Sequence, residues 1–162
     1  MIRAATKEDL PEISELLGQT WHATYDGIYG RERVSSVTAK WHSVANLVAG
    51  LDNPSRTFLV AEVNGTIVGT ASAAISPDNE TVTLARLYVH PHHQGLGLGK
   101  AMFAAMIAAY PNAKRLTLEV EPANSKAIGF YQAQGLAITG KTKDCGGCGD
   151  DIAALVLTKS FA

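Results

Sequence analysis

A glycine-rich run, QGLGLGK at residues 94–100, separates two stretches with different hydrophobic periods. The stretch 81–89 before it has the pattern of a strand, and the stretch 100–110 after it has the pattern of a helix. Glycine at this density costs backbone entropy, but it lets a ligand approach the main chain closely. The first N–H groups of the following helix then face that ligand, with the helix dipole behind them and Lys100 beside them. The pattern predicts a strand–turn–helix junction that binds an anion such as phosphate.

Two common phosphate-binding patterns fail at this run because of their spacing. The Walker A pattern requires a glycine five positions before Gly99 and a Ser or Thr after the lysine, where this chain has Gln94 and Ala101. The dinucleotide-binding pattern lacks its third glycine, whether it is counted from Gly95 or from Gly97. We therefore expect a phosphate cradle of neither type, and a glycine-rich turn without a ligand remains the alternative.

The rest of the chain alternates between helical and strand-like periods. Asn64-Gly65 separates two strand-like runs and predicts a tight hairpin. Gly135 follows a helical run that Asn124 begins, in the position of a helix-ending glycine. The order of elements predicts an α/β fold with a mixed sheet. The expected strands are 2–6, 57–63, 66–75, 81–89, 116–120, 136–141 and 151–158. A first helix is expected to begin at Thr6, and three further helices are expected over 31–48, 100–110 and 124–134.

Length and composition narrow the class of protein. A chain of 162 residues with 46% hydrophobic and 18% charged residues suits one soluble domain over residues 1–162. A net charge of −1 offers no field to attract a polyanion, so nucleic acid is not an expected partner. No apolar run reaches the length of a membrane span, the N-terminus turns acidic too early for a secretory signal, and two cysteines make no disulfide scaffold. We expect a cytoplasmic protein without membrane partners.

Two motifs in the right order resemble those of one known family. Residues 94–99 resemble the Q/R-x-x-G-x-G/A signature of the GNAT superfamily, the acyl-CoA-dependent N-acetyltransferases. Residues 118–136 resemble the second signature, in which a strand ends in Glu and an Asn starts a helix with a Phe-Tyr pair. Leu136 stands where the family normally has Phe, which affects packing only. The resemblance implies a single-domain fold with about seven mostly antiparallel strands and helices on both faces.

The resemblance also implies how acetyl-CoA is held. The main chain of the strand end, residues 87–89, would pair with the pantetheine arm, and an N–H there would stabilise the thioester oxyanion. The N–H groups of residues 95–100 would cradle the pyrophosphate, and Asn124 would contact the cofactor and cap its own helix. The expected cofactor-binding residues are Leu87, Tyr88, Val89, Gln94, Gly95, Leu96, Gly97, Leu98, Gly99, Lys100 and Asn124.

The resemblance further assigns the chemistry. The primary amine of a small molecule or a peptide attacks the acetyl thioester directly, and Tyr131 is the expected general acid for the departing thiolate. A thiol titrates near ~8.5 and a tyrosine near ~10, so this proton transfer is close in energy. Glu119 is the expected base, with Glu121, His90 or ordered water as alternatives. A catalytically silent acyl-CoA sensor and a nucleotide-binding module remain rival functions.

The acceptor side is less defined. Trp21 and Tyr25 fall on one helix face, and Asp26 offers a charge for a cationic amine, although the two aromatics also suit a core. His90, His92 and His93 lack an obvious further ligand, so we expect no metal. The terminal strands are candidate edges for a homodimer. Cys145 and Cys148 are read as part of a glycine-rich turn, with a reversible disulfide as the alternative.

Overall fold

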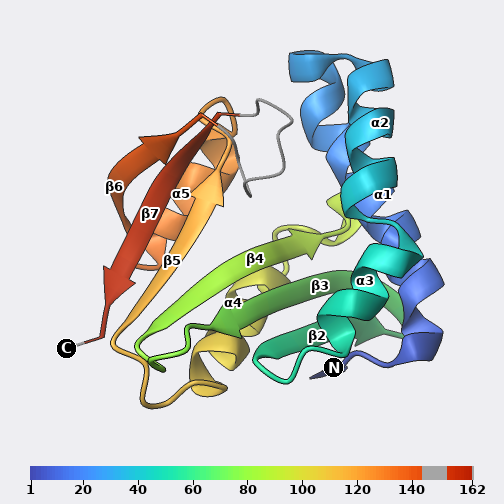
Figure 1. Ribbon diagram of the computed structural model, residues 1–162. Coiled ribbons are helices and arrows are strands. Elements are labelled where there is room, and N and C mark those ends of the chain that lie inside the picture. The colour runs from blue at the N-terminus through green and yellow to red at the C-terminus, as the bar shows by residue number, and fades with distance from the viewer. Residues whose placement is uncertain (144–152, 162) are drawn as a thin grey trace. The chain divides into compact units, whose positions relative to one another are not determined.

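The computed structural model describes residues 1–143 and 153–161, which form two compact units. The first unit comprises Met1–Ala73 and Arg86–Ala109, and the second comprises Ala74–Ala85 and Tyr110–Ala162. Seven strands form one sheet in the order β1-β2-β3-β4-β5-β7-β6, and β4 (Thr81–Val89) contributes to both units. The predicted α/β fold with a mostly antiparallel sheet is confirmed (Figure 1).

The helices of the first unit begin near the N-terminus. After β1 (Ile2–Ala4) come a short 3-10 turn, η1 (Lys7–Asp9), and the long helix α1 (Leu10–Tyr29). The helix expected over 31–48 is wrong, because the structure has two helices, α2 (Arg31–Trp41) and α3 (Val44–Leu51). The Ser43 side chain accepts a hydrogen bond from the Asn46 N–H at 3.2 Å and caps α3, which ends the preceding helix at a buried His42.

The predicted hairpin is confirmed. It joins β2 (Arg56–Val63) to β3 (Thr66–Ile75). Asn64 and Gly65 have φ values of 51° and 78°, in the left-handed region that two-residue hairpin turns require.

One face of the first unit's strands carries its hydrophobic core. Leu10, Ile13 and Leu17 of α1 pack with Leu47 of α3 and Val60 of β2. Figure 1 shows α3 on one side of β2 and β3 and the helix α4 (Leu98–Ala108) on the other. The residues of β2 and β3 that point toward α3 and α1 are therefore distinct from those that point toward α4.

Gly69 in the middle of β3 allows a close approach on the α4 side. A Cβ at this position would lie 2.8 Å from the Met102 Cε, 3.2 Å from the Tyr88 carbonyl oxygen and 3.3 Å from the Ala61 Cβ. Because the Tyr88 oxygen belongs to the main chain, this contact cannot be relieved by a side-chain rotation. Glycine at residue 69 therefore sets how closely β3 and β4 pack at this point.

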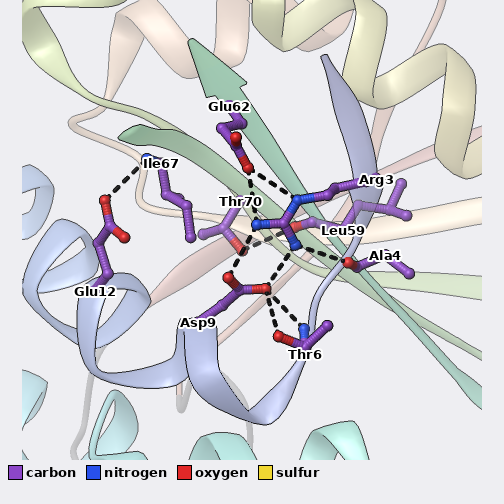
Figure 2. Close-up of polar contacts among 9 residues, drawn as sticks. All are labelled: Arg3, Ala4, Thr6, Asp9, Glu12, Leu59, Glu62, Ile67 and Thr70. Atoms are coloured by element: carbon purple, nitrogen blue, oxygen red, sulfur yellow. Dashed lines mark hydrogen bonds and ion pairs between the residues drawn. The ribbon is translucent and has the colours of Figure 1, made fainter. Parts of the chain in front are cut away.

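Arg3 ties the first strand to its neighbours (Figure 2). Its Nη1 and Nη2 donate to the Asp9 carboxylate at 2.7 and 3.0 Å, and its Nε donates to the Glu62 Oε2 at 2.9 Å. The Arg3 guanidinium lowers the pKa of Asp9 to about 2, and the two carboxylates raise the pKa of Arg3. The guanidinium is thus fully matched by acids.

The second unit contains the parallel strand pair and the C-terminal hairpin. In the parallel pair, Thr81–Leu84 of β4 lie beside Arg115–Leu118 of β5. The strand β7 pairs antiparallel with both β5 and β6. The strands are β5 (Arg115–Val120), β6 (Ala137–Thr142) and β7 (Ala154–Ser160). Cys145 and Cys148 lie outside the described residues, so the expectation about them stays a prediction.

The helix α5 (Ser125–Ala133) begins and ends as predicted. The Asn124 Oδ1 accepts a hydrogen bond from the Ala127 N–H at 3.2 Å, which caps the first turn. Gly135 has φ of 94°, the left-handed conformation that closes a helix at its C-terminus.

Candidate active site

The glycine run of the first unit forms the start of α4. Gly95 and Gly97 have φ values of 81° and 83°, and Gly97 is the residue before the first turn of the helix. The Ala101 N–H donates to the Gly97 carbonyl oxygen, so the N–H groups of residues 98–100 precede the helical ladder. No side chain caps this helix start, and a Cβ at either glycine would meet no atom within 4 Å. Glycine is therefore favoured at these two positions by the left-handed backbone and not by a lack of room for a side chain. The N–H groups at the helix start suit an anion.

The loop before the run is held by local hydrogen bonds. The Gln94 Nε2 donates to the Val89 carbonyl oxygen at 3.0 Å and links the end of β4 to the glycine run. The His90 N–H donates to the Val68 carbonyl oxygen at 2.7 Å, and the His90 Nδ1 accepts from the His92 N–H. Burial, with smaller contributions from His92 and His93, lowers the pKa of His90. The loop thus brings three imidazoles to the edge of the cradle.

Leu96 and Lys100 are the exposed side chains of the cradle. Leu96 is 70% exposed, although it is apolar, and it lies between the two left-handed glycines. Lys100 is exposed in the first turn of α4. An apolar side chain and a cation at one backbone cradle suit a ligand with both an apolar part and negative charge.

The strand β4 continues past the residues that pair with the parallel strand β5. This pairing covers Thr81–Leu84, whereas β4 continues to Val89. The main chain of Leu87–Val89, expected to hold the pantetheine arm, lies in this extension. Tyr88 is half-buried there, and its hydroxyl accepts a hydrogen bond from the Trp21 Nε1 at 3.1 Å.

The predicted acceptor residues Trp21 and Tyr25 are buried aromatic neighbours on α1. Their ring centroids lie 4.5 Å apart, and the Trp21 ring also packs against Trp41 at 5.2 Å and His42 at 5.4 Å. Trp21 is 5% exposed, so its indole contributes to packing and to the position of Tyr88. The structure thus brings two of the predicted acceptor residues together with the predicted cofactor strand.

Asp26 has two basic neighbours. Its Oδ1 lies 2.6 Å from the His22 Nδ1 and its Oδ2 lies 3.7 Å from an Arg31 nitrogen. The His22 Nε2 lies 3.4 Å from the Ser35 hydroxyl. The Asp26 carboxylate, predicted to receive a cationic amine, therefore already faces a histidine and an arginine.

The second unit holds the remaining predicted residues. Tyr131 is 8% exposed on α5, with its ring 5.2 Å from that of Phe130. Glu119 is exposed on β5. Glu121 lies just beyond that strand, and its Oε1 accepts from the Ala123 N–H at 3.2 Å. Asn124 uses its side-chain oxygen as a helix cap.

Sequence reasoning missed a basic cluster in the first unit. Arg56 donates to the Ser72 hydroxyl at 3.1 Å, and Arg86 donates to the Trp41 carbonyl oxygen at 3.2 Å. His42 is 3% exposed, and burial, with the charge of Arg86, lowers its pKa to about 3. No local pattern marks these residues, because each is defined by partners distant in sequence.

Two further properties concern only the described part of the chain. Within residues 1–143 and 153–161, no group of three or more His, Cys, Asp or Glu side chains is placed to hold a metal ion. In the same residues, no helix combines the length and apolar character that crossing a membrane requires.

Comparison with known proteins agrees with this geometry. The chain is 33% identical over 141 residues to the peptidyl-lysine N-acetyltransferase YiaC of Escherichia coli, covering 85% of this chain and 84% of that one. It is 36% identical over 93 residues to the streptothricin acetyltransferase of Streptomyces lavendulae, covering 56% of this chain and 49% of that protein. The crystal structure of the PaiA N-acetyltransferase of Thermoplasma acidophilum with coenzyme A superposes with a TM-score of 0.83 at 25% identity, covering 99% of this chain and 98% of that one.

The match to a family is the most direct of these findings. Residues 11–136 match the acetyltransferase (GNAT) family, so the match includes the glycine run and the Asn124 helix. This family uses acetyl-CoA, and the superposed relative was crystallised with coenzyme A. The donors at the start of α4 fit the phosphates of such a molecule. This chain belongs to the GNAT family of acetyltransferases.

Proposed function

We propose that this chain, acting as one domain over residues 1–162, transfers the acetyl group of acetyl-CoA to a primary amine. The observation that carries the proposal is the start of α4, where two left-handed glycines leave the N–H groups of residues 98–100 ahead of the helical ladder. Donors of this kind bind the pyrophosphate, and Lys100 adds a positive charge. The position of this cradle after β4, in a member of the GNAT family, supports the assignment.

The main chain of Leu87–Val89 holds the pantetheine arm in this proposal. These residues lie beyond the parallel register of β4, which supports their availability to a ligand. A main-chain N–H from this segment stabilises the oxyanion that forms when the amine attacks the thioester carbon. Gln94 and Leu96 complete the cradle, with Leu96 covering an apolar part of the ligand.

The two residues that transfer protons in this proposal lie in the second unit. Glu119 accepts the proton of the attacking amine, directly or through water, and Tyr131 donates a proton to the departing thiolate. The acetyl carbon forms its bond to nitrogen as the carbon–sulfur bond breaks, and the thiol leaves as free coenzyme A. The positions of Tyr131 on α5 and of Glu119 on β5, within the two motifs of the GNAT family, support these roles.

The cradle is tested with Gly97→Ala. Alanine at φ of 83° is strained by about 1–2 kcal/mol, so we expect about tenfold weaker acetyl-CoA binding by calorimetry. Gly18→Ala in α1 is the matched control, because its added Cβ would meet no atom within 4 Å and needs no left-handed backbone. Unchanged affinity in Gly97→Ala would contradict the cradle.

The chemistry is tested with Tyr131→Phe in a coenzyme A release assay over a panel of primary amines. We expect kcat to fall about 100-fold, the lower end of what a positioned general acid contributes. Tyr110→Phe removes a phenol two residues beyond the end of α4 and serves as control. Acetyl-CoA binding without turnover on any amine would favour the rival reading of a silent acyl-CoA sensor.

A further inference from the structure

Two arginines of the first unit lie on one face of the sheet, and their hydrogen-bond partners within residues 1–143 and 153–161 are neutral groups. The Arg56 Nη1 on β2 donates to the Ser72 hydroxyl on β3, and the Arg86 Nη2 on β4 donates to the Trp41 carbonyl oxygen. The three strands are consecutive in the sheet. Arg56 shares its face of β2 with Phe58 and Val60, which belong to the core under α1 and α3. Both residues are half-buried.

No acid compensates this pair within residues 1–143 and 153–161. In that part of the chain, ion pairs at 4.0 Å or less involve other cations, and none includes Arg56 or Arg86. The Trp41 carbonyl at the end of α2 supplies a partial negative charge of about half a unit at most. The cluster therefore keeps most of two positive charges.

Two side-chain nitrogens of this cluster are buried without a hydrogen-bond partner among the described residues. They are the Arg56 Nε and the His42 Nδ1. Burial lowers the pKa of Arg86, Tyr88 acts in the opposite direction, and the nearby charge of Arg56 lowers it further; Arg86 in turn contributes to the lowered pKa of His42. Two like charges with unsatisfied donors cost stability unless a ligand pairs with them. Guanidinium groups match the planar geometry of a carboxylate.

The position of Arg56 and Arg86 indicates that an anion bound there belongs to the amine acceptor, the second substrate, and not to acetyl-CoA. Arg86 and Tyr88 share one face of β4, because they are two residues apart on a strand. Tyr88 contacts Trp21 on this face, which is the side of α1 and α3, whereas α4 and its cradle lie on the other side of these strands (Figure 1). The pyrophosphate is already served by the start of α4, so a second anion site next to residues 87–89 fits the acceptor.

We propose that Arg56 and Arg86 bind a carboxylate on the acceptor, so that the preferred substrate is an amine that also carries a carboxylate. This inference rests on the proposed acetyltransferase activity. It disfavours polyamines, since two uncompensated cations repel a polycation. His42 lines the same cluster and supplies a further ring nitrogen to the carboxylate.

The test uses matched pairs of amines in the coenzyme A release assay. Straight-chain ω-amino acids from glycine to 6-aminohexanoate are compared with their amides, and spermidine is included as a polycation. We expect the acid to exceed its amide in kcat/KM by about tenfold or more at one chain length, as for a charge-assisted hydrogen bond. The chain length of greatest preference reports the separation between the arginines and the acetyl group. Amide formation makes short amines less basic, which works against the expected result and so cannot produce it.

The variants identify the arginines as the source of this preference. In the double variant Arg56→Gln/Arg86→Gln, the ratio of acid to amide should fall to near one, mainly through KM. Lys7→Gln removes the same kind of charge from an exposed side chain of η1 and should keep the wild-type ratio. Equal kcat/KM for acids and amides at every length, or a preference that survives the double variant, would overturn the inference while leaving the acetyltransferase activity intact.

A second measurement separates this inference from the proposed function. If the protein acetylates none of these amines, the proposed function fails, and thermal unfolding decides the carboxylate site alone. We expect the acids to raise the unfolding temperature of wild type and of Lys7→Gln more than their amides do, and to lose this advantage in the double variant. Equal shifts for acids and amides would overturn the carboxylate site.

Discussion

Arg3 and the pair Arg56 and Arg86 belong to the same unit but have opposite electrostatic surroundings. Arg3 donates to the carboxylates of Asp9 and Glu62, and these acids raise its pKa. Arg86 donates to a carbonyl oxygen, and its pKa is lowered, chiefly by burial. One guanidinium is matched by acids of the chain, and the other two are matched only by neutral groups in the described residues.

The difference separates a structural role from a binding role. A guanidinium that has its acids fixes strands and turns, as Figure 2 shows for Arg3 between β1, η1 and β2. A guanidinium without acids weakens the fold and is left ready for an external anion. This contrast predicts that changes at Arg3 lower stability, whereas changes at Arg56 and Arg86 alter substrate preference without lowering stability.

The largest expected effect comes from placing a carboxylate beside Arg56 and Arg86, which have no acidic partner in the part of the chain that the structure describes. Ser72 is fully buried, and its hydroxyl already accepts from Arg56. Ser72→Asp should place a carboxylate beside the pair and exclude the acceptor's carboxylate, so kcat/KM for amino acids should fall about 10–100-fold, while that for their amides changes little. Ser72→Asn is the matched neutral control and should keep the preference for acids. Loss of preference in both variants alike would indicate a steric effect and break the comparison.

A second effect concerns pH and the histidine of the basic cluster. Because the pKa of His42 is lowered to about 3 in the folded protein, its contribution to stability is full above about pH 6.5 and is lost as the pH falls toward 3. His42→Phe removes this titration, so its unfolding free energy should fall less between pH 6.5 and 4, by about 1–3 kcal/mol. Urea unfolding across this range measures it, with His92→Gln, an exposed imidazole, as control. Parallel curves for wild type and His42→Phe would show that His42 titrates normally.

The smallest effect, but the most direct contrast, is on thermal stability near neutral pH. Arg3→Gln should lower the unfolding temperature, because Asp9 and Glu62 lose their shared partner. Arg86→Gln should leave the unfolding temperature unchanged or raise it, because it removes a charge that has no acidic partner among the described residues. Arg3→Gln should also return the pKa of Asp9 from about 2 toward its usual value, so acid unfolding should begin at higher pH. Equal losses in the two variants would remove the distinction between the two places.

Local signals allowed much of the fold to be predicted. Asn64-Gly65 adopts the left-handed turn of the hairpin, and Asn124 and Gly135 begin and close α5 as expected. Each of these residues acts through its own backbone conformation or through a partner three residues away. The break between α2 and α3 was missed, because apolar residues continue at helical spacing through it and only the buried His42 and the Ser43 cap reveal it.

In the candidate site, too, features with a local sequence signal could be predicted, and features that depend on partners distant in sequence could not. The strand–turn–helix junction could be predicted from its glycines, since a left-handed backbone before a helix leaves a local signature, and its role as an anion cradle stays a prediction. The basic cluster could not be predicted, because an arginine is recognised as uncompensated only when all its spatial neighbours are known. Asp26 shows the same limit, since its pairing with His22 and Arg31 depends on how α1 and α2 pack.

Gly69 has a consequence for variation in this protein. Its missing carbon leaves 3.2 Å between a would-be Cβ and the carbonyl oxygen of Tyr88, on the strand that precedes the cradle. A methyl group here would press on that strand from behind, with no change to any residue that touches a substrate. Natural variants at residue 69 would therefore impair the enzyme in a way that a survey of active-site residues would overlook.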